Sequence, residues 1–181
     1  MASMQSALRA QITAMDDNWS GRDDGAAPST ATLVSRLNRQ LYESTSSETF
    51  ASFFCAMYDD SSGHLSYTNA GHLPPILVRD GVATRLEVNG VVMGFFPETT
   101  YGQNFLELRP GDLLAAFTDG ITESENANGE EFGAGRLAQL LIENAAHPLD
   151  GIVQTANRAF REWAFDIDSR DDATMLLARR L

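Results

Sequence analysis

The stretch that decides the fold is LLAAFTDGITE, residues 113–123, in which an apolar run leads directly into an Asp-Gly pair at Asp119. A short apolar run bounded by turn signals predicts a buried strand. A second strand is predicted over 173–178, directly after Asp171 and Asp172. If the two strands are antiparallel neighbours, the end of one lies beside the start of the other. The carboxylates that flank them would then meet at one rim of the sheet.

These acidic positions have two interpretations. Hard cations such as Mg²⁺ and Mn²⁺ prefer oxygen ligands in a near-octahedral arrangement, which carboxylates on adjacent strand ends can supply. However, an Asp-Gly pair after a strand is also a common turn signal, and an Asp before a strand is a common cap. Taken singly, each position favours the turn or the cap. The spacing alone therefore leaves both interpretations open.

Helices and further short strands surround this predicted pair. Apolar residues at helical spacing predict helices, and short apolar runs between Gly, Asp and Pro turns predict strands and hairpins. The expected helices are 3–15, 30–42, 132–146 and 149–163, with a polar loop at 16–29, and the expected strands are 50–58, 64–69, 76–78, 83–88, 101–108, 113–118 and 173–178. Helices at both ends of a run of short antiparallel strands predict an α+β fold.

The composition is that of a globular protein with an acidic surface. The chain has 181 residues, of which 43% are hydrophobic and 21% charged, and this length suits one domain. A formal net charge of −12 disfavours nucleic acid and anionic membranes as partners. We find no apolar run long enough to span a bilayer and no signal peptide. The single cysteine, Cys55, suits the reducing cytoplasm and is expected to be a buried apolar residue.

Six short motifs, in order and in register, resemble those of one family. TDGITE at 118–123 is similar to the TDG-[VI]-x-E motif of the SpoIIE/RsbU-type PPM phosphatases, which are metal-dependent protein serine/threonine phosphatases, and RDDAT at 170–174 is similar to their closing D-D-x-T motif. The other matches are YTNAGH at 67–72 followed by Pro74-Pro75, the region of Gly94, PGDL at 110–113 and NGEEFG at 128–133. The resemblance covers essentially the whole chain.

The resemblance implies an α-β-β-α sandwich of antiparallel sheets flanked by helices. It also implies a hydrolase that uses two Mn²⁺ or Mg²⁺ ions to activate a water molecule. On the matched motifs, Asp119 and Asp171 would bind metal, while Asp172, Gly120 and Glu123 would lie around those ligands. The implied substrate and partner is a phosphorylated small regulatory protein of the anti-sigma-factor antagonist type, in cytoplasmic bacterial signalling.

The chain also departs from the family pattern at its start. Residues 1–44 resemble the family's helical regulatory switch and residues 50–181 hold the sheet and the C-terminal helices, but the Gly-Asp and D-x-x-G-H-G motifs that open a complete domain are absent. We therefore expect residues 1–181 to be a single, partial phosphatase domain that lacks its N-terminal strands. Such a domain would hold at most one weakly bound metal ion and have low activity. Its uncovered sheet edge would favour a homodimer.

Two alternatives to an enzyme remain open. A non-catalytic interaction or dimerisation module would keep the fold without binding metal. An acidic cation-binding domain unrelated to phosphatases would bind metal independently of Asp119 and Asp171. A manganese titration separates the three hypotheses, because the enzyme requires binding that Asp119→Asn and Asp171→Asn each weaken.

Overall fold

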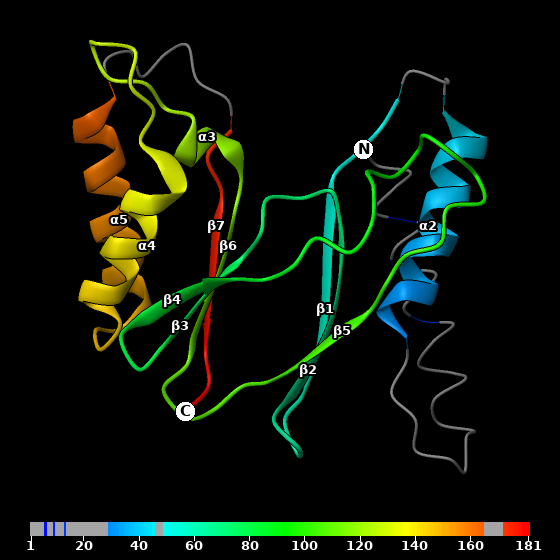
Figure 1. Cartoon of the computed structure of the whole chain (residues 1–181), viewed down its shortest axis with the longest axis horizontal. Helices are drawn as coiled ribbons and strands as arrows, with labels where there is room; N and C mark the ends of the chain where they lie inside the picture. Colours follow the sequence, from blue (N-terminus) through cyan, green and yellow to red (C-terminus); the bar gives the residue numbers. More distant parts are fainter. Residues whose placement is uncertain (1–5, 7–8, 10–12, 14–28, 46–48, 165–171) are drawn as a thin grey trace. The chain divides into compact units, whose positions relative to one another are not determined.

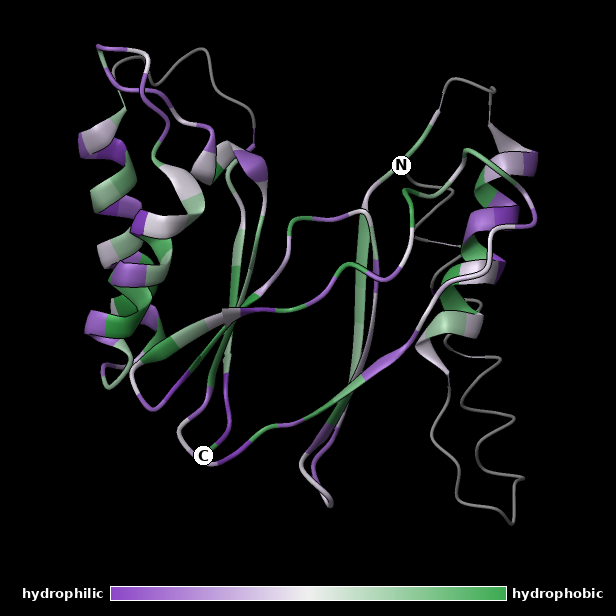
Figure 2. Ribbon diagram, in the orientation of Figure 1, coloured by the Kyte–Doolittle hydropathy of each residue, from purple (hydrophilic) through white to green (hydrophobic). Residues whose placement is uncertain are grey.

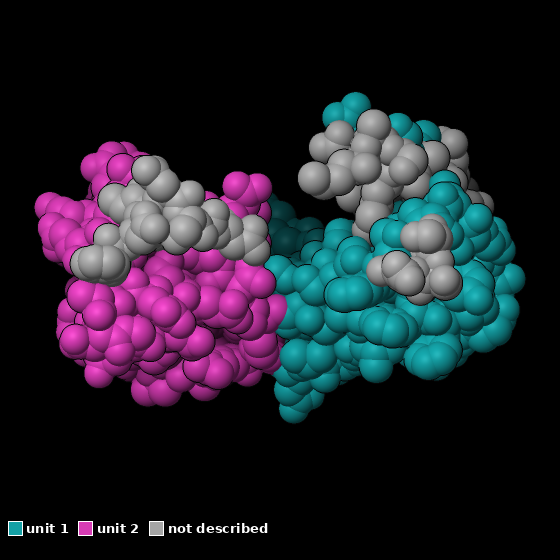
Figure 3. Space-filling model, turned by 90° about the horizontal axis from the view of Figure 1, so that it is seen from above, with its two compact units in different colours: residues 1–72, 87–107 teal, residues 73–86, 108–181 magenta. Residues whose placement is uncertain are grey.

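The computed structural model describes residues 6, 9, 13, 29–45, 49–164 and 172–181. The chain divides into two compact units, which Figure 3 colours teal and magenta. Unit 1 comprises Met1–His72 and Glu87–Glu107, and unit 2 comprises Leu73–Leu86 and Leu108–Leu181. Of the predicted helix 3–15, the described residues Ser6, Arg9 and Thr13 are helical. The rest of that helix and the predicted loop as far as residue 28 lie outside the described residues.

In unit 1, a helix packs on a three-stranded antiparallel sheet (Figure 1). The helix is α2, Thr30–Ser44, and the strands are β1, Phe53–Asp59, β2, His64–Ala70, and β5, Asn104–Glu107, in the order β1-β2-β5. The hairpin predicted from residue 50 to 69 is confirmed, since Phe53 pairs with Ala70 and Asp59 pairs with His64.

The sequence of α2 explains where it begins and which face it buries. Ser29 caps the helix, because its Oγ accepts a hydrogen bond from the Thr32 N–H at 3.3 Å. Leu33, Leu37 and Leu41 form the predicted apolar stripe and are all buried. Full burial of one such side chain contributes about 1.5–3 kcal/mol, so this stripe is what holds the helix on the sheet.

In unit 2, helices cover a four-stranded antiparallel sheet of order β4-β3-β6-β7 (Figure 1). Its strands are β3, Ile76–Arg79, β4, Val82–Arg85, β6, Leu113–Phe117, and β7, Met175–Arg179, and its helices are α3, Asp119–Thr122, α4, Gly133–Asn144, and α5, Leu149–Trp163. The condition set for the two strands that flank the acidic positions is met, because β6 and β7 are antiparallel neighbours.

The core of unit 2 lies between this sheet and helices α4 and α5. Leu113 and Phe117 of β6 pack in one cluster with Leu137, Leu141 and Ile152 of the helices. Figure 2 shows hydrophobic and hydrophilic residues alternating along α4 and α5, as expected for helices that bury one face. β6 pairs with β7 along its whole length and with β3 over residues 113–115.

The structure differs from the sequence-based expectation at several element ends. The strand predicted over 83–88 ends at Arg85, because the next residue, Leu86, lies opposite Pro75, which accepts the Leu86 N–H at 2.9 Å but has no N–H to return. The strand predicted over 101–108 spans only Asn104–Glu107, because the Gly102 N–H donates to the Asn89 carbonyl and its carbonyl accepts from the Thr68 hydroxyl, instead of bonding to the main chain of β2.

Cys55 of β1 packs beside the core cluster of unit 1 but is half-buried, not fully buried as predicted. Burial raises the pKa of its thiol to about 11, so the thiol stays neutral near pH 7 and does not act as a nucleophile. Within the part of the chain that the structure describes, no helix combines the length and the apolarity needed to cross a membrane.

Candidate functional site

The candidate site is the rim where β6 ends and β7 begins. Phe117 pairs with Met175 at the last position of the ladder. Asp119 follows two residues after Phe117 as the first residue of α3, and its side chain is exposed. Asp172 lies three residues before Met175 and is also exposed. The sheet therefore brings the two chain segments that carry these acids to the same rim.

Three hydrogen bonds from Thr118 join the two segments. Its N–H donates to the Thr174 carbonyl at 3.0 Å, and its Oγ1 accepts from the Thr174 N–H at 2.9 Å. The same hydroxyl donates to the main-chain carbonyl of Asp172 at 2.8 Å. Sequence analysis gave Thr118 no role beyond membership of the TDG motif, although a threonine between a strand and an Asp-Gly pair is a recognisable cap signal.

The residues after Asp119 form a short helix where a turn was predicted. The Glu123 N–H donates to the Asp119 carbonyl at 2.8 Å, and the Gly120 N–H donates to Asp119 Oδ1 at 2.9 Å. Gly120 is buried, and its carbonyl accepts from Ser124 Oγ at 2.8 Å. The Gly120 N–H thus fixes one oxygen of the Asp119 carboxylate, and the rest of the group faces solvent. Glu123 is exposed at the end of the helix.

The structure thus describes some of the predicted site residues and shows how they are connected. Asp119, Gly120 and Glu123 belong to one tight turn of helix, and Asp172 is joined to that turn through Thr118. Asp171 lies outside the described residues. Among the residues that are described, no group of three or more His, Cys, Asp or Glu side chains gathers as a metal site would require.

The donors present nevertheless have the right chemistry for a hard cation. Asp119 and Asp172 are exposed carboxylates on segments that the sheet brings together, and Mg²⁺ or Mn²⁺ is commonly held by one or two carboxylates with water in the other positions. The chemistry of these described donors therefore suits a metal ion that keeps much of its water shell.

Solved structures with the same fold define the class of protein. The RsbU and RsbW domains of Rv1364c from Mycobacterium tuberculosis match with a TM-score of 0.74 and 24% identity, over 99% of this chain and 47% of that one. The SiaA-PP2C domain of Pseudomonas aeruginosa matches with a TM-score of 0.77 and 22% identity, over 98% and 69%. The phosphatase domain of SpoIIE from Bacillus subtilis, presoaked with Mn, matches with a TM-score of 0.61 and 17% identity, over 93% and 71%. The chain thus has the mixed helix and antiparallel-sheet fold of the PPM, or PP2C-type, phosphatase domains, as predicted.

The sequence comparison identifies the family within this class. The model of the Stage II sporulation protein E (SpoIIE) family matches residues 1–181, and the chain belongs to that family. Protein IcfG of Synechocystis is 40% identical over 96 residues, which is 52% of this chain and 15% of that protein. The phosphoserine phosphatase RsbU of Bacillus subtilis is 27% identical over 150 residues, which is 82% of this chain and 44% of that protein. The chain spans less than half the length of either relative.

Proposed function

We propose that this chain carries the metal-dependent phosphatase function of its family and removes phosphate from serine or threonine of a regulatory protein. The observation that carries the proposal is the place of Asp119. The TDG aspartate, Asp119, stands just after strand β6. Thr118 beside it donates a hydrogen bond to the main chain of Asp172, the second aspartate of the D-D-x-T motif. The family match over the full chain and the similarity to a phosphoserine phosphatase support the same activity.

In this proposal Asp119 and Asp171 hold a Mn²⁺ or Mg²⁺ ion, and Asp172, Gly120 and Glu123 surround these ligands. A bound divalent ion supplies a water molecule of lowered pKa and neutralises charge on the phosphoryl oxygens. Hydrolysis joins the water oxygen to phosphorus and breaks the bond between phosphorus and the serine or threonine oxygen, which takes up a proton. The Gly120 N–H holds one oxygen of the Asp119 carboxylate at the rim.

The proposed substrate is a phosphoprotein of the anti-sigma-factor antagonist type, in the cytoplasm. The similarity to RsbU and to a structure that contains both an RsbU and an RsbW domain supports this class of partner. An exposed rim suits a protein substrate, because a phosphorylated side chain on a folded partner can reach exposed carboxylate-bound ions but not a deep cavity.

Manganese-dependent hydrolysis of an aryl phosphate tests the proposal. Loss of an outer partner of a metal ligand typically costs 10–100-fold in metal affinity or activity. Removal of a ligand in Asp119→Asn should therefore lower turnover by on the order of a hundredfold or more. Since the chain spans less than half the length of its relatives, the assay is run both on the 181 residues and on a longer version of the same protein.

Asp150→Asn is the matched control, because it makes the same change of charge on an exposed residue of α5 in the same unit. It should keep full turnover. If neither protein hydrolyses the substrate, or if Asp119→Asn and Asp150→Asn are equally active, the enzymatic proposal is wrong and the non-catalytic interaction module becomes the better hypothesis.

A further inference from the structure

The main chain changes from strand to helix at Thr118, and this change removes one bond from the β6–β7 ladder. In a regular antiparallel ladder, a hydrogen-bonded pair exchanges two bonds between main-chain groups. Thr118 makes the first of these bonds, from its N–H to the Thr174 carbonyl. Its own carbonyl accepts instead from the Ile121 N–H at 3.2 Å, inside α3. The second bond of the pair therefore has no main-chain acceptor.

The side chain of Thr118 supplies the missing acceptor. Its Oγ1 accepts the Thr174 N–H at 2.9 Å, where the carbonyl of a continuing strand would have done so. A hydroxyl can also donate one hydrogen bond, and this one donates to the Asp172 carbonyl at 2.8 Å. One hydroxyl thus replaces a ladder bond and extends the connection by two residues, toward the D-D-x-T aspartates.

Packing contributes little to the position of the segment that Thr118 holds. Residues 172, 173 and 174 are all exposed, so little apolar burial fixes them. Three hydrogen bonds of Thr118 connect this segment to the end of β6. Outer partners of this kind set the orientation of metal ligands and are nearly as important for affinity as the ligands themselves.

We infer that Thr118 is a positioning residue, whose hydroxyl holds the segment 172–174 beside Asp119 so that the acids of both motifs face one ion. The part of the inference that concerns the ion rests on the proposed function. The part that concerns the position of the segment stands on the hydrogen bonds alone. If only the β-branched shape of Thr118 mattered, the hydroxyl would make no difference at this position.

Two substitutions separate the hydroxyl from the shape of the side chain. Thr118→Val keeps the volume and branching but leaves the Thr174 N–H and the Asp172 carbonyl without this partner. Thr118→Ser keeps the hydroxyl and loses only a methyl group. Both are compared with the wild-type chain at a temperature where circular dichroism shows all three to be folded, so that a general loss of stability does not enter the comparison.

The first measurement is amide hydrogen exchange at Thr174. Loss of the hydrogen bond should speed exchange by roughly tenfold or more in Thr118→Val, because the net free energy of one such bond corresponds to about that factor. Thr118→Ser should exchange at close to the wild-type rate. Equal rates in the wild type and Thr118→Val would overturn the inference, whatever the metal result.

The second measurement is Mn²⁺ affinity, from the electron paramagnetic resonance signal of free Mn²⁺ in a titration of each variant and of Asp119→Asn. We expect Thr118→Val to bind roughly 10–100-fold more weakly than the wild type, and Thr118→Ser to restore the affinity. If Asp119→Asn binds as the wild type does, the proposed function fails while the exchange result still decides the position of the segment. If Asp119→Asn binds weakly but Thr118→Val binds normally, only the positioning role is wrong.

Discussion

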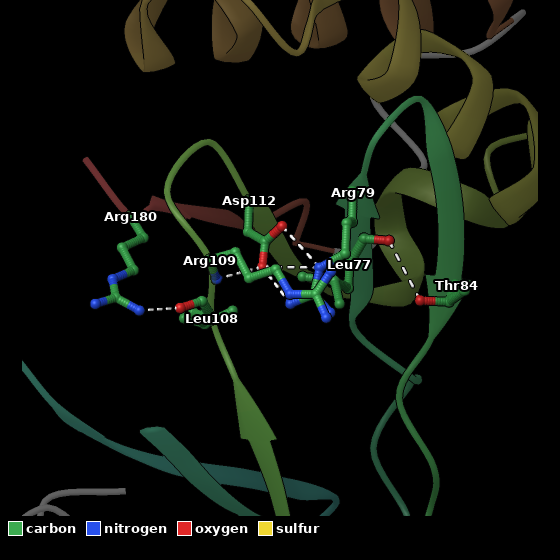
Figure 4. A network of polar contacts seen from close by, with 7 residues as sticks. All are labelled: Leu77, Arg79, Thr84, Leu108, Arg109, Asp112 and Arg180. Carbon is green, nitrogen blue, oxygen red and sulfur yellow. Dashed lines mark hydrogen bonds and ion pairs between the residues drawn. The ribbon is translucent and has the colours of Figure 1, made fainter. Parts of the chain in front are cut away.

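Asp112 shows how one buried carboxylate is kept charged at the other end of β6 (Figure 4). Its side chain is 3% exposed and accepts from Arg79 Nε at 2.9 Å, from Arg79 Nη2 at 2.5 Å and from the Arg109 N–H at 2.7 Å. Burial by itself raises the pKa of Asp112, but the hydrogen bonds and charges of Arg79 and Arg109 outweigh it and hold the pKa below its usual value. The carboxylate thereby closes the turn predicted over 109–112 and joins it to the end of β3.

Asp112→Asn should therefore destabilise the protein in a manner that depends on pH. Removal of one partner from a buried ion pair costs about 3–5 kcal/mol, and because Arg79 keeps 24% exposure we expect about 2–4 kcal/mol at pH 7. The folded pKa is depressed, so the contribution is complete above the unfolded pKa of about 3.9 and is lost as pH falls through the folded value. Urea unfolding of both proteins between pH 7 and pH 2 should show their free energies of unfolding converging below about pH 4.

The difference between the two proteins is the quantity to follow, because other carboxylates also titrate in this range. The pKa of Asp59 is lowered to about 2 by hydrogen bonds from Ser62 and Ser61, and this group contributes equally to the wild type and the variant. A difference in free energy that stays constant from pH 7 to pH 2 would show that Asp112 is not charged in the folded protein.

At the scale of elements, α2 is joined to a loop as well as to a sheet. Asn38 is fully buried on α2, and its Nδ2 donates to the Phe96 carbonyl at 2.8 Å while its Oδ1 accepts from the Gly94 N–H at 2.8 Å. Gly94 has φ +95°, and a Cβ there would lie 2.5 Å from the Thr49 carbonyl oxygen. The positive φ and the nearby Thr49 carbonyl explain why residue 94 is a glycine. The Gly94 N–H, which needs an acceptor, explains why the buried amide of Asn38 faces it.

Asn38→Ala should be strongly destabilising for its size. It leaves the Gly94 N–H without its partner, and an unsatisfied buried group costs about 1–3 kcal/mol, whereas the Phe96 carbonyl still accepts from Thr99. We expect a loss of about 1–3 kcal/mol in the free energy of unfolding, measured by urea denaturation at pH 7.

Arg39→Ala is the control on the adjacent residue. Arg39 pairs with Glu98 at 2.7 Å, but the two side chains are 54% and 78% exposed, and exposed pairs contribute about 0–1 kcal/mol. A cost for Asn38→Ala no larger than that of Arg39→Ala would contradict the role assigned to the buried amide.

At the scale of the whole molecule, negative charge is compensated only in part. The sequence has 25 acidic and 13 basic residues, and every basic residue is an arginine. Several of these arginines bind main-chain carbonyls: Arg136 at Glu131 and Phe132, Arg179 at Ala145 and His147, and Arg180 at Leu108. Such arginines close loops and strand ends through carbonyl groups, and the net charge of the sequence remains −12.

Salt should therefore stabilise the protein. With a net charge of −12, repulsion between acidic groups opposes the compact state, and it is screened beyond about 10 Å at 0.1 M ionic strength. Raising NaCl from about 0.01 M to 0.3 M should increase the melting midpoint by a few degrees, since 1 kcal/mol corresponds to about 2–4 °C for a chain of this length. A scanning calorimetry series measures the shift, and a midpoint that falls with salt would show that favourable ion pairs dominate instead.

The sequence by itself determined which segments form elements and to which family they belong. The apolar run before Asp119, the stripe of Leu33, Leu37 and Leu41 and the turn at 109–112 follow from local spacing, and the structure confirms all three. Spacing suffices there because a strand or helix buries whichever face its own period makes apolar. The pairing of the strands beside the two acidic motifs was left as a condition, because local spacing does not choose a partner strand, and the structure supplies it.

Only the tertiary structure decided how these motifs are held together. The use of the Thr118 hydroxyl in place of a carbonyl and the burial of Asn38 depend on partners 54 to 58 residues distant in the sequence. The burial of Asp112 depends on Arg79, 33 residues distant. A polar side chain gives the same local signal whether it faces water or a buried partner. Its role is set by what the fold brings within hydrogen-bonding distance, because an unpaired polar group is costly only where water is excluded.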